Sequence, residues 1–305
     1  MGSVTPRSGS PVKGYPEAGP VQRAAAAFAD SIPVDPADDG FFGPASVTWR
    51  LGSDLSSPVA GLSSLLLQAL HPLAMAGVDQ HSHWRDDPGG RYASTSAYVV
   101  TTTYGDRAAA TAAADRVRKI HEYVRGVDTV TGKPYAAGDP ALLIWVHAAM
   151  VECGLAAASR YGLALTPAEQ DQYVAEMTAA AELIGVPAAS FADGGAPASV
   201  AELGAYFDAV RPSLATSKST EDTAAYLIGT PDVEPELADV WSVLAAAAVA
   251  SLPDWARDMY GFADEAPDRE EVRQVLGIVD AVYLGEPGVL EARQRLTLRM
   301  RAAGR

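Results

Sequence analysis

The chain has 305 residues, of which 48 % are hydrophobic and 20 % are charged, and its formal net charge is −15 at pH 7. A chain of this length can bury a sizeable core, whereas so acidic a protein would repel phosphates, which argues against a nucleic-acid partner. The single cysteine, Cys153, excludes a disulfide framework and a cysteine zinc site, and it fits a reducing cytoplasm.

The N-terminal segment differs in composition from the rest of the chain. Residues 1–40 are rich in Gly, Pro and Ser, which predicts a flexible arm with at most a short helical turn and no apolar core of a signal peptide. From residue 41 to residue 305 one helical pattern follows another. The sequence therefore predicts an all-α protein with a single globular domain, 41–305.

The first predicted helices are defined by apolar runs and capping residues. Residues 57–78 are apolar on all sides, which suits a buried helix, although Pro72 predicts a kink at His71. Asp106 can cap a helix that we expect to continue to Arg125 and to end at Gly126. Residues 127–139 have the composition of a loop.

The later helices have equally clear signals. Pro140 starts a helix to about Tyr161, and Thr166 starts another that ends at Gly185. Further helical patterns cover 197–214, 219–229, 235–253, 269–285 and a basic segment, 290–304. Residues 47–51 and 98–104 are rich in β-formers, the second within a helical context. The apolar stretches contain polar side chains and follow soluble periodicity, so we expect no membrane span.

One cationic cluster departs from the acidic composition. On a helix, Arg118, His121 and Arg125 fall at i, i+3 and i+7 and share a face, whereas Arg116 points away from it. Two arginines would keep the imidazole neutral, as a metal ligand must be, and would bind carboxylates. A cofactor with a Lewis-acidic metal and two carboxylates, such as haem b, would satisfy both demands. The alternative is a solvated face whose arginines pair with nearby acidic residues.

Six ordered motifs narrow this choice. In chain order, between about Leu51 and Tyr260, they are LLLQALHPLAMAGVDQHS, DPGGRYAST, ADRVRKIHEYVRG, KPYAAGDPALLIWVHA, LIGVP and LPDWARDMYG. Their order and spacing resemble the MpaB-type oxygenase family, which includes the latex-clearing rubber oxygenases. The resemblance implies a helical protein with a globin-like core that holds haem b. It further implies that His121 is the axial iron ligand, that Arg118 and Arg125 support it, and that Arg257 could reach a haem propionate.

The distal motif departs from the family pattern. Rubber oxygenases have Arg-x-x-Lys-Thr, and this chain has Arg91, Ser94 and Thr95 at those positions. Serine is short and a poor iron ligand, so the resemblance implies an open distal position, with Arg91 and Thr95 left to hold a propionate or to polarise dioxygen. This departure argues against rubber cleavage as the specific reaction.

The remaining histidines have weaker signals. His147 lies in an apolar run, which favours a core histidine, with a pocket role or axial ligation as the alternative. His81 and His83 alternate beside acidic residues without any standard metal-ligand spacing.

We therefore predict a cytoplasmic haem b oxidoreductase, an oxygenase that combines dioxygen or peroxide with a hydrophobic small molecule. The alternatives are a haem-dependent peroxidase or dehydrogenase of natural-product metabolism, and a non-catalytic haem-binding helical protein. The sequence specifies no oligomeric state.

Overall fold

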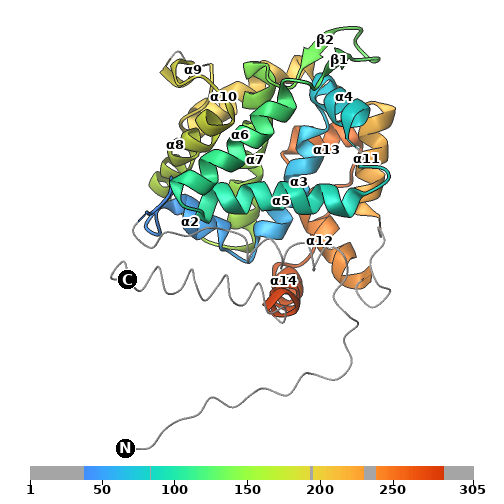
Figure 1. Cartoon of the computed structure of the whole chain (residues 1–305). Helices are drawn as coiled ribbons and strands as arrows, with labels where there is room; N and C mark the ends of the chain where they lie inside the picture. The colour runs from blue at the N-terminus through green and yellow to red at the C-terminus, as the bar shows by residue number, and fades with distance from the viewer. Residues whose placement is uncertain (1–37, 83, 193–194, 230–237, 285–305) are drawn as a thin grey trace, which may run out of the picture.

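The computed structural model describes residues 38–82, 84–192, 195–229 and 238–284 (Figure 1). Most of the predicted N-terminal arm, His83 and the predicted helix at 290–304 lie outside these residues. The elements are α2 (Val47–Gly52), α3 (Ser57–Gln68), α4 (Pro72–His81), α5 (Pro88–Tyr104), α6 (Arg107–His121), β1 (Arg125–Val127), β2 (Pro134–Ala136), α7 (Pro140–Tyr161), α8 (Pro167–Ile184), α9 (Ala189–Ala192), α10 (Val200–Val210), the short 3-10 helix η1 (Arg211–Ser213), α11 (Lys218–Ile228), α12 (Ala238–Ala250), α13 (Asp254–Tyr260) and α14 (Arg269–Leu284). The predicted all-α class is confirmed.

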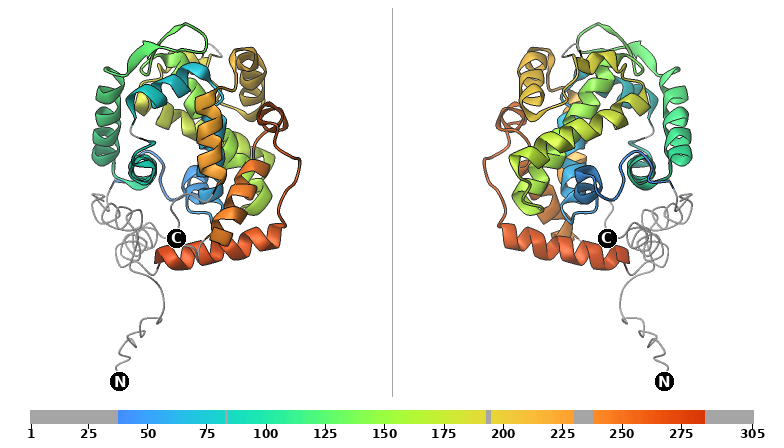
Figure 2. Two further views of the ribbon diagram at one scale, coloured as in Figure 1. Left: turned by 90° about the vertical axis from the view of Figure 1, so that its right-hand side faces the viewer. Right: turned by 90° about the vertical axis from the view of Figure 1, so that its left-hand side faces the viewer.

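Helix α7 is the centre of the hydrophobic core. Its packing against α3 is the most extensive contact between two elements of the described chain, and α8, α4 and α14 also contact it. Trp145 and Val151 on α7 are fully buried. The apolar composition of α7 on all sides follows from this position, because neighbours cover every face of the helix. Figure 2 shows α14 crossing the end of the body that lies opposite the β1–β2 hairpin.

The apolarity of α7 also satisfies a length-and-composition test for a membrane helix. The mean hydropathy of its most apolar stretch is 1.8, and 67 % of that stretch is buried inside the protein. Helices α3 and α4 pass the same test only as a pair, and they are bent by 102° at the break between them. A central helix of a protein core has the same composition, so the packing accounts for it.

The break between α3 and α4 lies where Pro72 predicts it. His71 is the extended N-cap of α4, and Pro72 occupies the first position of that helix. The proline has no N–H to donate to a preceding turn, so one continuous helix over 57–78 does not form. The two helices leave His71 buried at the corner, with its ring centroid 5.6 Å from that of Trp145.

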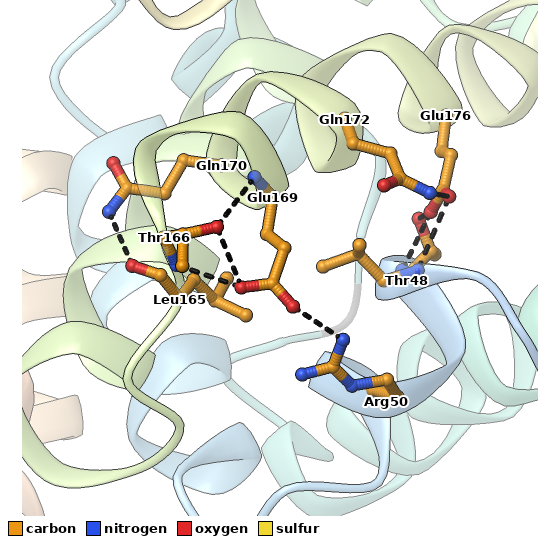
Figure 3. Close-up of polar contacts among 9 residues, drawn as sticks. Thr48, Arg50, Leu165, Thr166, Glu169, Gln170, Gln172 and Glu176 are labelled. Carbon is orange, nitrogen blue, oxygen red and sulfur yellow. Dashed lines mark hydrogen bonds and ion pairs between the residues drawn. The ribbon is translucent and has the colours of Figure 1, made fainter.

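Side-chain caps define several helix ends, as their sequences predict. The carboxylates of Asp106 and Asp139 accept backbone N–H groups at the starts of α6 and α7. Thr166 and Glu169 form a reciprocal capping box at the start of α8 (Figure 3). Gly185 ends α8 with a φ of 112°, a left-handed conformation that favours glycine.

Helix α8 also holds α2 in place, through side chains that bond to Thr48 and Arg50. Glu176 accepts hydrogen bonds from the backbone N–H and the hydroxyl of Thr48 at 2.8 and 2.9 Å, and Arg50 bonds to Glu169 at 2.7 Å (Figure 3). The β-rich residues 47–51 are therefore helical, because Glu176 satisfies N–H groups that the first turn of α2 leaves free.

The C-terminal end of α6 differs from the prediction. The helix ends at His121 and not at Arg125, and its last turn tightens, with Tyr123 donating to the carbonyl of Ile120 at 3.0 Å. Residues 125–127 pair with 134–136 as an antiparallel hairpin, although the sequence pattern predicts that Arg125 ends the helix and that residues 127–139 form a loop. Strand pairing with a segment nine residues away is a tertiary contact, and it overrides the local helical pattern.

Candidate functional site

His121 is the last residue of α6, and its ring is half-buried. The Nδ1 atom is buried and has no hydrogen-bond partner among the described residues. Burial, and then the positive charge of Arg91, lower the pKa of the imidazole. The ring is therefore neutral at pH 7, and a neutral imidazole can use a lone pair to bind a metal.

Arg91 lies in the first turn of α5, which Asp87 caps by accepting the N–H of Gly90 at 2.9 Å. Helices α5 and α6 meet at Gly105 and diverge from that turn, so Arg91 and His121 both lie near the free ends of the two helices (Figure 1). The Arg91 side chain is exposed, yet burial by surrounding protein lowers its pKa.

No described residue forms an ion pair or a hydrogen bond with the Arg91 guanidinium, whereas its backbone carbonyl has two partners. The hydroxyls of Ser94 and Thr95 each donate to this carbonyl at 3.0 Å. Ser94 is exposed and Thr95 is half-buried on the same turns of α5. The structure thus brings Arg91, Ser94 and Thr95 together on one helix, and the charge of Arg91 acts on the pKa of His121.

Arg118 lies three residues before His121 on α6, as predicted, but its guanidinium has protein partners. Its guanidinium bonds to Asp115 and to the carbonyl of Leu183 at the C-terminal end of α8. The side chain thereby ties α6 to α8, and its positive charge also reaches Tyr98 on α5. The pKa of Tyr98 is raised to about 12 because burial outweighs the lowering effect of Arg118.

Arg125 lies on β1 and is exposed, with its guanidinium bonded to the carbonyl of Glu122. The expected i, i+3, i+7 face is therefore wrong for Arg125, because α6 ends at His121, whereas Arg118 and His121 keep their spacing on that helix. The carbonyl of Arg125 lies 3.2 Å from Nε2 of His81, which places His81 against the hairpin.

Arg257 is buried at the junction of α12 and α13. Its guanidinium donates to the carbonyl of Leu252 at 2.8 Å and to Asp254 and Asp264 at 2.7 and 3.0 Å. A weaker contact reaches the carbonyl of Ala250 at 3.4 Å. These partners favour a structural role, in which Arg257 satisfies the last carbonyls of α12, over the predicted contact with a propionate.

His147 lies on α7 and is buried, as the apolar run predicts. Burial lowers its pKa to about 4, and its Nε2 atom has no hydrogen-bond partner among the described residues. His71 is also buried, and its Nδ1 atom likewise has no partner in the described chain. Both rings are neutral at pH 7, but they belong to the α3–α7 core, whereas His121 and Arg91 belong to the α5–α6 pair.

Two features of the site were missed by sequence reasoning. The first is the proximity of Arg91 to His121, two residues thirty positions apart, for which no local pattern exists. The second is Tyr98, whose β-rich surroundings, YVVTTTY, form the second half of α5. Thr101 and Thr102 donate their hydroxyls to carbonyls of the preceding turn, at 2.9 and 3.0 Å, which accommodates them in a helix.

The described residues contain no group of three or more His, Cys, Asp or Glu side chains that could hold a metal ion. His81 therefore has no such cluster around it, and His83 lies outside the described chain.

Comparison with known proteins identifies the family. No curated protein and no solved structure matches the chain significantly. Residues 49–281 match the family model described as "ER-bound oxygenase mpaB/B'/Rubber oxygenase, catalytic domain". The match covers α2 to α14 and includes the α5–α6 pair with Arg91 and His121. The chain therefore belongs to the mpaB/rubber oxygenase family.

Proposed function

We propose that the protein is a haem b-dependent oxygenase that acts on a hydrophobic small molecule and uses dioxygen or peroxide. The family supports an oxygenase at the coarse level. The observation that carries the finer proposal is a neutral imidazole, His121, with an unbonded Nδ1 atom beside the unpaired guanidinium of Arg91.

The residues of the site fit haem b in two respects. The described residues hold no cluster of three metal-ligating side chains, so a metal at His121 must bring its other ligands, as the iron of a porphyrin does. A haem also brings two propionates, and Arg91 is a cation without a protein partner in the described chain. Burying a propionate without such a partner would cost several kcal/mol, roughly the penalty of an isolated buried charge.

In this proposal each residue has a separate task. His121 holds the iron through one ring nitrogen, and Arg91 neutralises a propionate or donates to an oxygen species. The hydroxyl of Thr95, now bonded to the Arg91 carbonyl, can turn to donate a second hydrogen bond. Ser94 occupies the position of the family lysine without reaching across the site. When bound, the haem would supply the oxygen chemistry that these side chains cannot perform.

The hydrophobic substrate is supported by the apolar character of the neighbouring helix surface. Tyr98 and Val99 on α5 are half-buried, and the raised pKa of Tyr98 keeps its phenol neutral. A neutral phenol and an aliphatic side chain on the same helix as Arg91 favour contact with an apolar molecule. A cytoplasmic location belongs to the same proposal and is supported by the free Cys153, and so does the expected absence of a membrane span.

The experiment is haem titration of the purified protein, followed by absorbance in the Soret region. We expect stoichiometric binding by the wild type and none by His121→Ala. His81→Ala is the matched control, because His81 is an exposed histidine that lies against the same hairpin. His147→Ala tests the rival ligand, and circular dichroism verifies the fold of each variant. Loss of the Soret band in His147→Ala, with retention in His121→Ala, would contradict the assignment.

A further inference from the structure

The tip of the molecule around the β1–β2 hairpin exposes apolar side chains. Six large hydrophobic side chains are exposed among the residues whose burial the structure describes, and four of them lie here. They are Ile120, Tyr123, Val127 and Val130, with exposed fractions of 55, 79, 56 and 53 %. We call these four residues the hairpin patch. Such clustering distinguishes the patch from the isolated apolar residues found on any protein surface.

The hairpin that presents the patch is held firmly. Tyr135 on β2 is buried against α4, where its hydroxyl donates to Gln80 at 2.8 Å. Asp128 is buried in the turn and accepts bonds from the N–H and the hydroxyl of Thr131 at 2.7 and 2.6 Å. Burial alone would raise the pKa of Asp128, but these bonds and that from Val130 lower it, so the carboxylate stays charged. The fold therefore fixes Val127 and Val130 in exposed positions.

Positive charge surrounds the hairpin patch. Residues 116–133 contain five Lys and Arg side chains and two acidic ones, which gives this segment a net charge of +3. Because the whole chain has a net charge of −15, all other residues together carry −18. Lys119 and Lys133 are exposed, and neither forms an ion pair with a described residue. The tip is thus cationic and apolar on a protein that is otherwise strongly acidic.

We propose that the hairpin patch docks the protein on the surface of an anionic lipid bilayer. Apolar side chains insert into the headgroup region while flanking lysines bind lipid phosphates, and Tyr is favoured at this interface. The rest of the protein surface is acidic and would be repelled by the same lipids. The molecule would therefore be oriented with the hairpin patch facing the bilayer. Figure 1 shows the hairpin at one end of the body and α14 at the other, so the tip is free to approach a flat surface.

Docking would bring the candidate site to the membrane. Ile120 of the hairpin patch precedes His121 directly in the chain. A hydrophobic substrate dissolved in the bilayer would then reach the site without crossing water; this last step rests on the proposed function, whereas docking does not.

The test is cosedimentation of the full chain, without added haem, with vesicles of phosphatidylcholine and phosphatidylglycerol in equal parts, and with vesicles of phosphatidylcholine alone. We expect binding to the anionic vesicles that weakens as salt is added, and much weaker binding to the neutral vesicles. Each basic residue near an anionic surface raises the partition coefficient about fivefold. Lys119→Gln combined with Lys133→Gln should therefore lower it on the order of 25-fold.

Val127→Asp combined with Val130→Asp should also abolish most binding, because a carboxylate is costly to remove from water and is repelled by anionic lipids. Two controls come from the opposite end of the molecule, Ile278→Asp and Arg273→Gln on α14; Ile278 is 45 % exposed. Both should bind like the wild type. Failure of the wild type to bind anionic vesicles, equal binding to neutral vesicles, or equal losses in the controls would overturn the proposal. So would a dimer in sedimentation that the two aspartates dissociate, because a second copy would then cover the patch.

Discussion

Arg91 and His121 lie close together, although they come from different helices and thirty residues separate them in the chain. Burial is the larger cause of the lowered His121 pKa, and the Arg91 charge adds to it. The same guanidinium has no ion-pair partner in the described residues. A cation without a protein partner among the described residues is available to bind the anion of a cofactor, and this relationship underlies the first prediction.

Replacing Arg91 with Gln should raise the pKa of His121 toward its ordinary value, without reaching it, because burial remains. The measurement is a histidine titration by NMR in the haem-free protein. Arg116→Gln is the control, because Arg116 is exposed on α6, the helix of His121, and is not among the causes of the lowered His121 pKa. The Arg91 variant should also bind haem about 10- to 100-fold more weakly, the loss expected for one charged hydrogen bond. An unchanged pKa and unchanged haem affinity would remove Arg91 from the site.

Replacing Ser94 with Lys tests the distal departure from the family. The Ser94 hydroxyl is bonded to the Arg91 carbonyl at 3.0 Å, and the side chain is too short to reach an iron on another element. In the haem-loaded wild type we therefore expect cyanide and imidazole to bind in one fast phase. Ser94→Lys should add a slow phase, because a lysine can cap the iron and must first leave. A slow phase in the wild type would show that another side chain caps the metal.

His147 should make the protein sensitive to acid. Its pKa is lowered to about 4 in the folded protein, from an ordinary value of 6.5. Between these two pH values the imidazole of His147 is protonated in the unfolded chain and neutral in the folded protein. The free energy of unfolding therefore falls as the pH decreases from 6.5 to 4. The contribution is about 3 kcal/mol, from 1.36 kcal/mol per unit of pKa. Buried His71 and His121 act in the same direction, since burial lowers their pKa values too.

The measurement is urea unfolding at several pH values for the wild type and for His147→Leu. The Leu variant should lose a large part of the pH dependence, and it should be relatively more stable at pH 5 than at pH 7.5. His81→Leu is the control, because His81 is exposed. Parallel pH profiles of the wild type and the His147 variant would contradict the assignment.

Arg257→Leu should destabilise the protein without weakening haem binding. The guanidinium is buried, with 9 % of the side chain exposed, while its partners Asp254 and Asp264 are 91 and 93 % exposed. The ion pairs are therefore screened, and most of the effect comes from the carbonyl of Leu252, which would lose its donor. We expect a loss of about 2 kcal/mol in the free energy of unfolding. Exposed Arg273→Leu is the control, and a weaker haem affinity in Arg257→Leu would restore its predicted cofactor role.

The sequence alone determined the features that depend on neighbouring residues. The helices after Asp106, Asp139 and Thr166 begin where their capping residues predict, because a cap acts on N–H groups within three residues. Pro72 marks the break between α3 and α4 for a similarly local steric reason. The apolar periodicity of 140–161 predicted the buried α7, and the family motifs singled out His121.

Tertiary structure decided what local pattern could not. No residue within one turn of His121 indicates that the helix ends there. The helix ends because Arg125 pairs with a strand formed by residues 134–136, which are distant in the local pattern. The partners of two arginines are likewise set by the fold. The guanidinium of Arg118 donates to the carbonyl of Leu183 on α8, and that of Arg257 donates to the carbonyl of Leu252 after the end of α12. The charge of Arg91 on α5 acts on His121 on α6, an effect between two helices that no local sequence pattern reveals. A guanidinium binds whichever acceptor the packed helices bring near it, so its partner is fixed by the three-dimensional arrangement and not by its spacing in the chain.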